Sequence, residues 1–225
     1  MSSYDGRVTP GGPAQTRDLG VLSITKLAVD PQMSNNSYLL RCTETGTQVL
    51  IDAAAEAPRL LELIGPSGLS AVVTTHQHWD HHRALAEVVE ATGRPLVIAG
   101  EPDAEAITEQ TGVAVDRTIG DGDRIAVGTC SLEAIAIAGH TPGSVCRLYG
   151  ESTGRPHLFT GDCLFPGGVG STFGDPVAFD QLYEQVTTKI FDRLPDSTLF
   201  YPGHGNDGRL GDERPHLAPW RARGW

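Results

Sequence analysis

Short apolar runs separated by turn residues follow a polar start of the chain. Residues 1–18 are polar and rich in Gly, Pro and Ser, so we expect a flexible N-terminal arm there. Residues 21–29, 37–42 and 48–52 are β-branched or apolar runs bounded by turn residues. This pattern predicts three consecutive antiparallel strands.

The pattern then changes to an alternation of strands and helices. Apolar residues recur at helical spacing over residues 55–64, 81–92, 103–111 and 178–194. Short apolar runs predict strands at residues 69–75, 95–99, 124–127, 131–138, 144–149, 157–160 and 198–201. Since no linker or fixed-period repeat interrupts this order, we expect one domain over residues 19–225, with sheets inside and helices outside.

Composition and charge narrow the function classes. The 225 residues include 28 acidic and 17 basic side chains, for a formal net charge of −11. A nucleic-acid-binding surface would be basic, so we expect no nucleic acid partner. No apolar run approaches the roughly 18 residues that span a bilayer, and the first residues form no secretory signal, so we expect no membrane partner and a cytoplasmic location. The excess of Arg over Lys indicates a bacterial host with a GC-rich genome.

The densest group of reactive side chains is the segment THQHWDHH, which follows a predicted strand. It contains His76, His78, Asp80 and His81. Histidines two residues apart on an extended segment point to the same side, because side chains alternate. Imidazole nitrogens and carboxylate oxygens are ligands for Zn²⁺ and similar metals. We therefore predict a metal site at the end of this strand.

Three more candidate ligands follow downstream, each at the end of an apolar strand. They are His140 in GHTPGS, Asp162 in FTGDCLF and His204 in YPGHG. The neighbouring glycines let the backbone turn tightly and leave the ligand accessible. Together with the histidine cluster, these segments form an ordered set of metal-binding candidates.

This ordered set resembles the metallo-β-lactamase fold superfamily and, within it, the glyoxalase II (hydroxyacylglutathione hydrolase) type. The resemblance runs from about residue 20 to residue 208 and includes all four segments quoted above. It implies an α/β (α+β) chain folded as a four-layered αββα sandwich, with two mixed sheets between outer helices. It also implies a ligand set, in which His76, His78 and His140 hold a first metal ion, Asp80, His81 and His204 hold a second, and Asp162 bridges both.

The reaction that the resemblance implies is metal-assisted hydrolysis of a small-molecule thioester. Two divalent ions share a bridging water and lower its pKa toward about 7, which yields a metal-bridging hydroxide that attacks the carbonyl. Zinc is the expected metal, and iron and manganese are the alternatives that an all-N/O site also accepts. Asp80 is expected to shuttle the proton to the leaving group. Asp52 is a candidate acceptor for the N–H of a ligand imidazole, with a turn cap as its alternative role.

Two departures from the glyoxalase II pattern leave other substrates open. The chain ends 21 residues after His204, which would be too short for the C-terminal helical domain that helps to hold glutathione, and residues 166–175 differ from the usual segment. We therefore expect a low-molecular-weight thiol that need not be glutathione. The alternatives are a mono-iron persulfide dioxygenase, whose cluster shares the His-x-His-x-Asp-His pattern, and a lactonase of the same fold. The sequence indicates neither the substrate-binding residues nor the oligomeric state.

Several further residues are assigned structural places. We expect His82 on a helix face or beside the metal ligands, but not as a ligand itself. We expect Trp79 packed near the metals, Cys163 facing the core, His157 on the surface, and the C-terminal tail from residue 215 packed on the domain.

Overall fold

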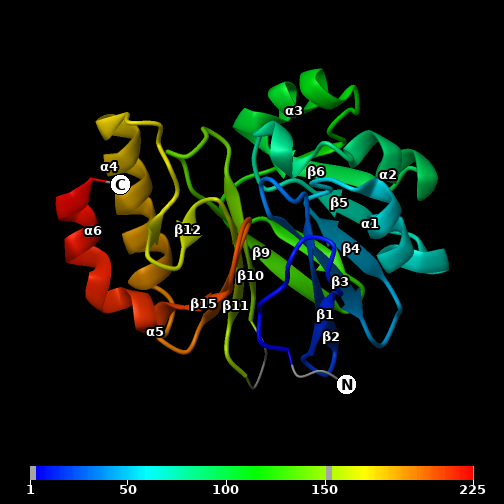
Figure 1. The fold of residues 1–225 in the computed structure, drawn as a ribbon, viewed down its shortest axis with the longest axis horizontal. Helices are drawn as coiled ribbons and strands as arrows, with labels where there is room; N and C mark the ends of the chain where they lie inside the picture. Colours follow the sequence, from blue (N-terminus) through cyan, green and yellow to red (C-terminus); the bar gives the residue numbers. More distant parts are fainter. Residues whose placement is uncertain (1–3, 151–153, 225) are drawn as a thin grey trace.

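The structure is a computed structural model that describes residues 4–150 and 154–224, and two β-sheets form its centre (Figure 1). Within the described residues, the first sheet has seven strands arranged in chain order. Strands β1 to β4 are antiparallel, whereas β4 to β7 are parallel. Their bounds are β1 Gln15–Asp18, β2 Leu22–Val29, β3 Asn35–Cys42, β4 Gln48–Ile51, β5 Ala71–Val73, β6 Leu96–Gly100 and β7 Arg117–Ile119.

The second sheet has six strands in the described part of the chain, in the order β15-β14-β11-β10-β9-β8. Neighbouring strands are antiparallel except β11 and β14, which are parallel. A separate hairpin pairs β12 with β13. The bounds are β8 Arg124–Val127, β9 Cys130–Ala136, β10 Val145–Tyr149, β11 His157–Gly161, β12 Leu164–Phe165, β13 Gly168–Val169, β14 Leu199–Pro202 and β15 Gly208–Arg209.

Helices cover the outer face of each sheet (Figure 1). Helices α1 to α3 pack on the first sheet through residues such as Leu60, Leu85 and Ile107. Helices α4 to α6 pack on the second sheet through residues such as Phe179 and Trp220. None of the helices in the described residues has the length and apolar character needed to span a bilayer. The bounds are α1 Ala57–Ile64, α2 Leu85–Ala91, α3 Ala104–Thr111, α4 Pro176–Val186 (extended by a π-helical turn, Thr187–Phe191), α5 Leu210–Glu213 and α6 Leu217–Arg223.

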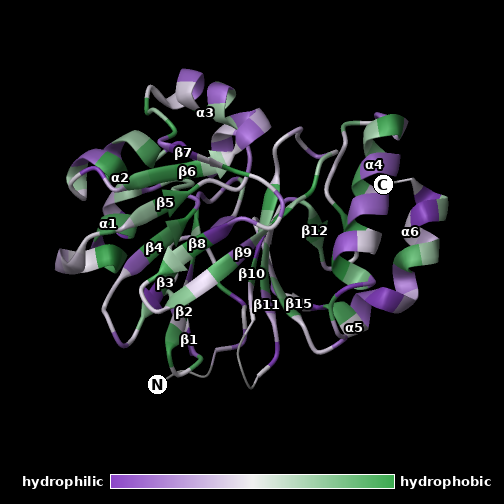
Figure 2. Cartoon of the chain, turned by 180° about the vertical axis from the view of Figure 1, so that it is seen from behind, coloured by the Kyte–Doolittle hydropathy of each residue, from purple (hydrophilic) through white to green (hydrophobic). Residues whose placement is uncertain are grey.

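A third apolar cluster lies between the two sheets. It includes Leu40 and Val73 of the first sheet and Leu132 and Phe159 of the second, all at most 1% exposed. Each sheet is therefore apolar on both faces, and Figure 2 shows its central strands largely in the hydrophobic colour, whereas the helices alternate. These three clusters separate four layers, so the predicted αββα sandwich is confirmed.

The N-terminal segment differs from the flexible arm expected over residues 1–18. Its last four residues form β1, which pairs with β2 along its whole length. Earlier in the segment, the Tyr4 hydroxyl donates a hydrogen bond to Asp207 Oδ2 at 2.6 Å. The strand was missed because an edge strand with one exposed face needs no continuous apolar run. Residues 1–3 of the expected arm lie outside the described residues.

The C-terminal tail packs on the domain, as predicted. Trp220 in α6 is 2% exposed, and its ring centroid lies 6.1 Å from that of Phe191. Cys163 is buried in the same apolar cluster, which confirms its predicted orientation toward the core. Trp225, the other tryptophan of the tail, lies outside the described residues.

His157 is buried in the core, so its predicted place on the surface is wrong. Its side chain is 1% exposed, and Nδ1 lies 2.6 Å from the Tyr201 hydroxyl. Burial lowers the pKa of His157 to about 4, because a charged imidazolium loses its hydration there. This burial could not be predicted from the sequence, since one histidine at the start of a short strand resembles a surface residue.

We expect this burial to make stability depend on pH. Below about pH 6.5 the unfolded chain protonates His157, whereas the folded chain keeps it neutral until about pH 4. Stability should therefore fall by up to about 3 kcal/mol between pH 7 and pH 4 because of this residue. Urea unfolding of metal-free wild type and His157→Gln at both pH values would measure it. An equal fall in the free energy of unfolding of the two proteins between pH 7 and pH 4 would contradict the assignment of this pH dependence to His157.

Candidate metal centre

The candidate ligands lie where strands of both sheets end. The histidine segment follows β5 and leads into the short 3-10 helix Trp79–His81. His140 follows β9, Asp162 follows β11, and His204 follows β14. Because these strand ends meet at one edge of the sandwich, side chains far apart in the sequence come together there.

Three imidazoles form the first group of converging ligand atoms. His76 Nε2 lies 3.1 Å from His78 Nδ1 and 3.2 Å from His140 Nε2, and the latter two nitrogens are 2.9 Å apart. His76 and His140 are buried, and His78 is partly buried. Nitrogens at this mutual spacing can bind one cation with bonds of about 2.0–2.1 Å.

A second group lies beside the first. His81 Nε2 and His204 Nε2 are 3.2 Å apart. Asp80 Oδ2 lies 3.5 Å from His81 Nε2 and 3.4 Å from His204 Nε2. Two nitrogens and one carboxylate oxygen therefore converge on a second point.

Asp162 faces both groups. Its Oδ2 lies 3.7 Å from His140 Nε2 of the first group and 3.4 Å from His204 Nε2 of the second. Its Oδ1 is buried 3.4 Å from His81 Nε2 and accepts no hydrogen bond from the residues that the structure describes. A Cβ at Gly203 would lie 2.2 Å from this Oδ1, so only glycine permits the close approach.

Hydrogen bonds at Nδ1 fix the orientation of four histidines. A donor proton at Nδ1 leaves the lone pair of Nε2 free to bind a cation. In each case Nε2 is the atom that points into the cluster. The acceptors are Thr75 Oγ1 for His76 at 3.0 Å, Asp52 Oδ2 for His81 at 2.9 Å, Ser171 O for His140 at 2.7 Å and Met33 O for His204 at 2.8 Å.

Asp52, the candidate acceptor, joins two parts of this cluster. Besides His81 Nδ1, its carboxylate accepts hydrogen bonds from Thr75 N at 2.7 Å and Thr75 Oγ1 at 2.8 Å. The same threonine hydroxyl accepts from His76 Nδ1. Asp52 thus orients one histidine of each group, one of them through Thr75.

Asp103 is a positioning residue that the sequence did not reveal. Its fully buried carboxylate accepts from Gln77 N at 2.9 Å, Gly143 N at 2.7 Å and the Thr141 hydroxyl at 2.6 Å. The first donor lies between His76 and His78, and the other two follow His140. Asp103 therefore holds together the two loops that supply the first group.

The His204 loop is held from the first sheet. Asn36 Nδ2 donates to Pro202 O and Gly205 O, both at 2.9 Å. The Tyr38 hydroxyl also donates to Pro202 O, at 2.7 Å. Lys26 Nζ, fully buried, donates to Gly205 O at 2.8 Å. These contacts fix the backbone on both sides of His204.

Most of the cluster has the protonation states in which ligands bind cations. Burial holds the pKa of His76 well below its usual range. Burial and repulsion from His140 lower the pKa of His78 to about 4, so both histidines stay neutral. Burial would raise the pKa of Asp162, but His81 and His204 hold it well below its usual range. The two carboxylates in turn raise the pKa of His204 to about 9 against the effect of burial. A bound cation would displace that proton.

Two side chains next to these ligands in the sequence have other contacts. Trp79 is 53% exposed, and its ring lies over the Arg83 guanidinium at 4.6 Å, so its predicted packing near the metals is wrong. His82 is buried beside the end of the 3-10 helix, and its Nε2 donates to Gln77 O at 3.1 Å. Neither joins the converging ligand atoms.

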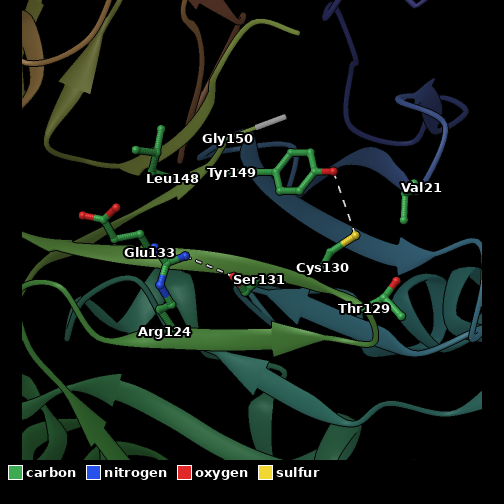
Figure 3. A pocket seen from close by; sticks show the side chains of 9 residues that line it. All are labelled: Val21, Arg124, Thr129, Cys130, Ser131, Glu133, Leu148, Tyr149 and Gly150. Carbon is green, nitrogen blue, oxygen red and sulfur yellow. Dashed lines mark hydrogen bonds between the residues drawn. The ribbon is translucent and has the colours of Figure 1, made fainter. Parts of the chain in front are cut away.

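A separate pocket of about 400 Å³ lies at the other end of β9, where that strand begins (Figure 3). Arg124, Cys130 and Tyr149 are among its lining residues, and the Tyr149 hydroxyl lies 3.9 Å from Cys130 Sγ. None of the candidate metal ligands lines this pocket. The converging ligand atoms therefore lie apart from this pocket.

The fold and the ligand set define the class of protein. The sequence profile of the metallo-beta-lactamase superfamily matches residues 30–204, and the chain belongs to this family. The predicted family is thereby confirmed. The donor set, the Nδ1 anchors and the orphaned Asp162 oxygen all fit bound metal ions.

Similar proteins divide between two activities. The hydroxyacylglutathione hydrolase of Polaromonas sp. is 36% identical over 175 residues, which cover 76% of this chain and 62% of that protein. The mitochondrial persulfide dioxygenase ETHE1 of Homo sapiens is 36% identical over 183 residues, which cover 80% of this chain and 67% of that protein. The chain thus spans about two thirds of the length of these relatives.

Two solved structures match the chain over most of its length. The crystal structure of ETHE1 from Myxococcus xanthus matches with a TM-score of 0.74 and 29% identity, covering 88% of this chain and 84% of that one. The crystal structure of TTHA1623 in a di-iron-bound form matches with a TM-score of 0.68 and 30% identity, covering 84% of this chain and 96% of that one. Both similarities extend over nearly the whole sandwich.

Proposed function

We propose that the chain is a binuclear metal-dependent hydrolase that cleaves a small-molecule thioester, in the manner of glyoxalase II. The observation that carries this proposal is the second ligand group, Asp80, His81 and His204, which converges beside the first with Asp162 facing both. Asp80 and His81 also belong to the His-x-His-x-Asp-His pattern that mono-iron dioxygenases share, so the number of metal ions per chain decides between a hydrolase and a dioxygenase. The hydroxyacylglutathione hydrolase relatives and the di-iron form of TTHA1623 support the hydrolase proposal.

The residues have distinct roles in this proposal. His76, His78 and His140 would hold one ion, Asp80, His81 and His204 would hold the other, and Asp162, which faces both groups, would be shared between them. When bound, two divalent ions, zinc in our proposal with iron and manganese as alternatives, acidify a water between them and polarise the carbonyl. No serine or cysteine nucleophile is then required.

Asp80 is proposed to carry the proton to the leaving thiolate. Asn35 Nδ2 donates to its Oδ2 at 2.9 Å, which fixes the carboxylate at the edge of the cluster. Hydrogen bonding from His204 and the charge of His81 keep the pKa of Asp80 below its usual range despite burial, so it starts ionised and can accept a proton.

A persulfide dioxygenase is the second candidate. The 36% identity to human ETHE1 over 183 residues favours it, since this equals the identity to the Polaromonas hydrolase. In that case a single iron and molecular oxygen would take part in the reaction. The two candidates therefore differ in oxygen consumption.

Turnover with oxygen recorded separates these candidates. The metal-loaded protein is given hydroxyacyl-glutathione, thioesters of other small thiols and glutathione persulfide in an oxygen-electrode cell. We expect thiol release from at least one thioester without oxygen uptake. Oxygen uptake with the persulfide, and no thioester cleavage, would overturn the hydrolase proposal.

A further inference from the structure

Phe173 lies exposed beside the first ligand group. It is 76% exposed, and its ring centroid lies 5.5 Å from that of His78 and 6.0 Å from that of His140. The ring meets His78 edge to face, with an interplanar angle of 87°. A large apolar side chain thus stands in water next to the reacting centre.

The backbone at Phe173 is also in an unfavourable conformation. Its φ is +55°, in the left-handed region that glycine prefers and bulky residues avoid. Its N–H donates to Ser171 Oγ at 3.1 Å, and Ser171 O accepts from His140 Nδ1 at 2.7 Å. The loop is therefore fixed to a candidate metal ligand and holds the ring in place.

The far end of the loop is equally fixed. Asp175 Oδ1 accepts from Val177 N at 2.8 Å and from Ala178 N at 3.2 Å, so it caps helix α4. Thr172 Oγ1 donates to Asp175 O at 3.1 Å. Because both ends are held, the strained residue is a built feature of the fold.

Two independent penalties meet at Phe173, namely exposed apolar surface and a left-handed backbone. Both features raise the free energy of the folded chain. A ligand that covers the Phe173 ring would offset the cost of its exposure to water. We propose that Phe173 is a specificity-determining residue, on which an apolar or aromatic substituent of the substrate packs. This inference rests on the proposed thioester hydrolysis and narrows its substrate class.

The rest of the rim is consistent with an apolar substituent. Phe165 lies on the other side of the cluster, with its ring centroid 6.3 Å from that of His204. Met33, whose carbonyl holds His204, is 42% exposed. Arg83, the cation next to the histidine segment in sequence, is already paired with Asp30. Because Arg83 is paired with Asp30, it offers no free positive charge to a substrate thiol that carries several carboxylates.

The test compares four thioesters that combine acetyl or phenylacetyl groups with N-acetylcysteamine or benzyl mercaptan. The variants are Phe173→Ala and Phe173→Leu. Val177→Ala is the matched control, because Val177 is 75% exposed nearby and belongs to neither ligand group. Calorimetric titration with the matching thioethers, which have CH₂ in place of the carbonyl, measures binding without turnover.

We expect Phe173→Ala to lower kcat/KM about tenfold for the substrates whose aromatic group packs on the ring, mainly through KM. The affinity of Phe173→Ala for the matching thioethers should fall in parallel. The kcat/KM of Phe173→Leu should lie between those of wild type and Phe173→Ala. The kcat/KM for acetyl-N-acetylcysteamine, which has no aromatic group, should hardly change. If kcat/KM falls for the phenylacetyl substrates, the acyl group packs on Phe173. If it falls for the benzyl mercaptan substrates, the thiol part packs there. Metal content should stay equal in all variants.

The other outcomes separate this inference from the proposed function. Thioester turnover with unchanged selectivity and unchanged thioether affinity in Phe173→Ala would overturn the inference and leave the hydrolase proposal intact. No turnover of these four thioesters or of hydroxyacyl-glutathione, with thioether affinity that depends on Phe173, would overturn the hydrolase proposal and support apolar recognition. If neither thioester turnover nor Phe173-dependent thioether affinity is observed, both the hydrolase proposal and the inference about Phe173 are overturned.

Discussion

Asp162→Ala should abolish hydrolysis and lower the metal content of the chain. The carboxylate lies 3.7 Å from His140 Nε2 of one ligand group and 3.4 Å from His204 Nε2 of the other, so its loss affects both ions. Without it, two cations would repel each other with no anion between them. We expect kcat to fall on the order of a thousandfold, the upper end for removal of one electrostatic contact to the transition state.

Metal analysis and initial rates on the purified variant measure this effect. Asp123→Ala is the control, since Asp123 is an exposed turn residue that accepts a hydrogen bond from Gly120 N. The control should keep wild-type metal content and activity. Full activity in Asp162→Ala would contradict the bridging role.

Asp103→Ala should impair the site without removing any ligand. Three donors, Gln77 N, Gly143 N and the Thr141 hydroxyl, would lose their acceptor. Each buried donor left unpaired costs about 1–3 kcal/mol, so the free energy of unfolding should fall by about 3 kcal/mol or more. Because the two histidine loops would separate more easily, metal affinity should fall about 10- to 100-fold.

Urea unfolding and competition with a chelator measure the two parts of this prediction. Asp116→Ala is the matched control, because Asp116 also accepts a strand N–H, from Val97 at 2.8 Å, but contacts no histidine loop. The control should leave metal affinity unchanged. Equal metal affinity in Asp103→Ala and wild type would contradict the positioning role.

The sequence indicated the parts of the fold whose pattern is local. The longer buried strands and helices α1 to α4 were predicted from apolar runs or helical spacing, because each of these elements carries its own periodicity. Helices α5 and α6 and the two-residue strands β12, β13 and β15 were not predicted. Edge strand β1 and the three-residue β7 were not predicted, since neither needs a long apolar run. Family resemblance was required to arrange these elements in two sheets.

In the candidate site, too, the residues of a local motif could be predicted, whereas residues that meet only in the folded chain could not. His76, His78, Asp80 and His81 stand in one short segment, so their chemistry can be predicted from spacing. Asp103 could not be found, because its partners lie 26 to 40 residues away and meet it only in the folded chain.

Exposure and burial of single residues were the hardest features to predict. Phe173 has an unremarkable sequence context, and only the folded loop places it beside His78 and His140. His157 and Trp79 were assigned the wrong environments for the same reason. Whether a side chain is covered depends on elements distant in the sequence.

Metal content per chain tests the central claim most directly. The purified protein is loaded with zinc, freed of excess metal and analysed by mass spectrometry, with His204→Ala in parallel. The account predicts about two ions per wild-type chain and about one in the variant, since His204 belongs only to the second group. One ion per chain in both proteins would contradict the binuclear centre.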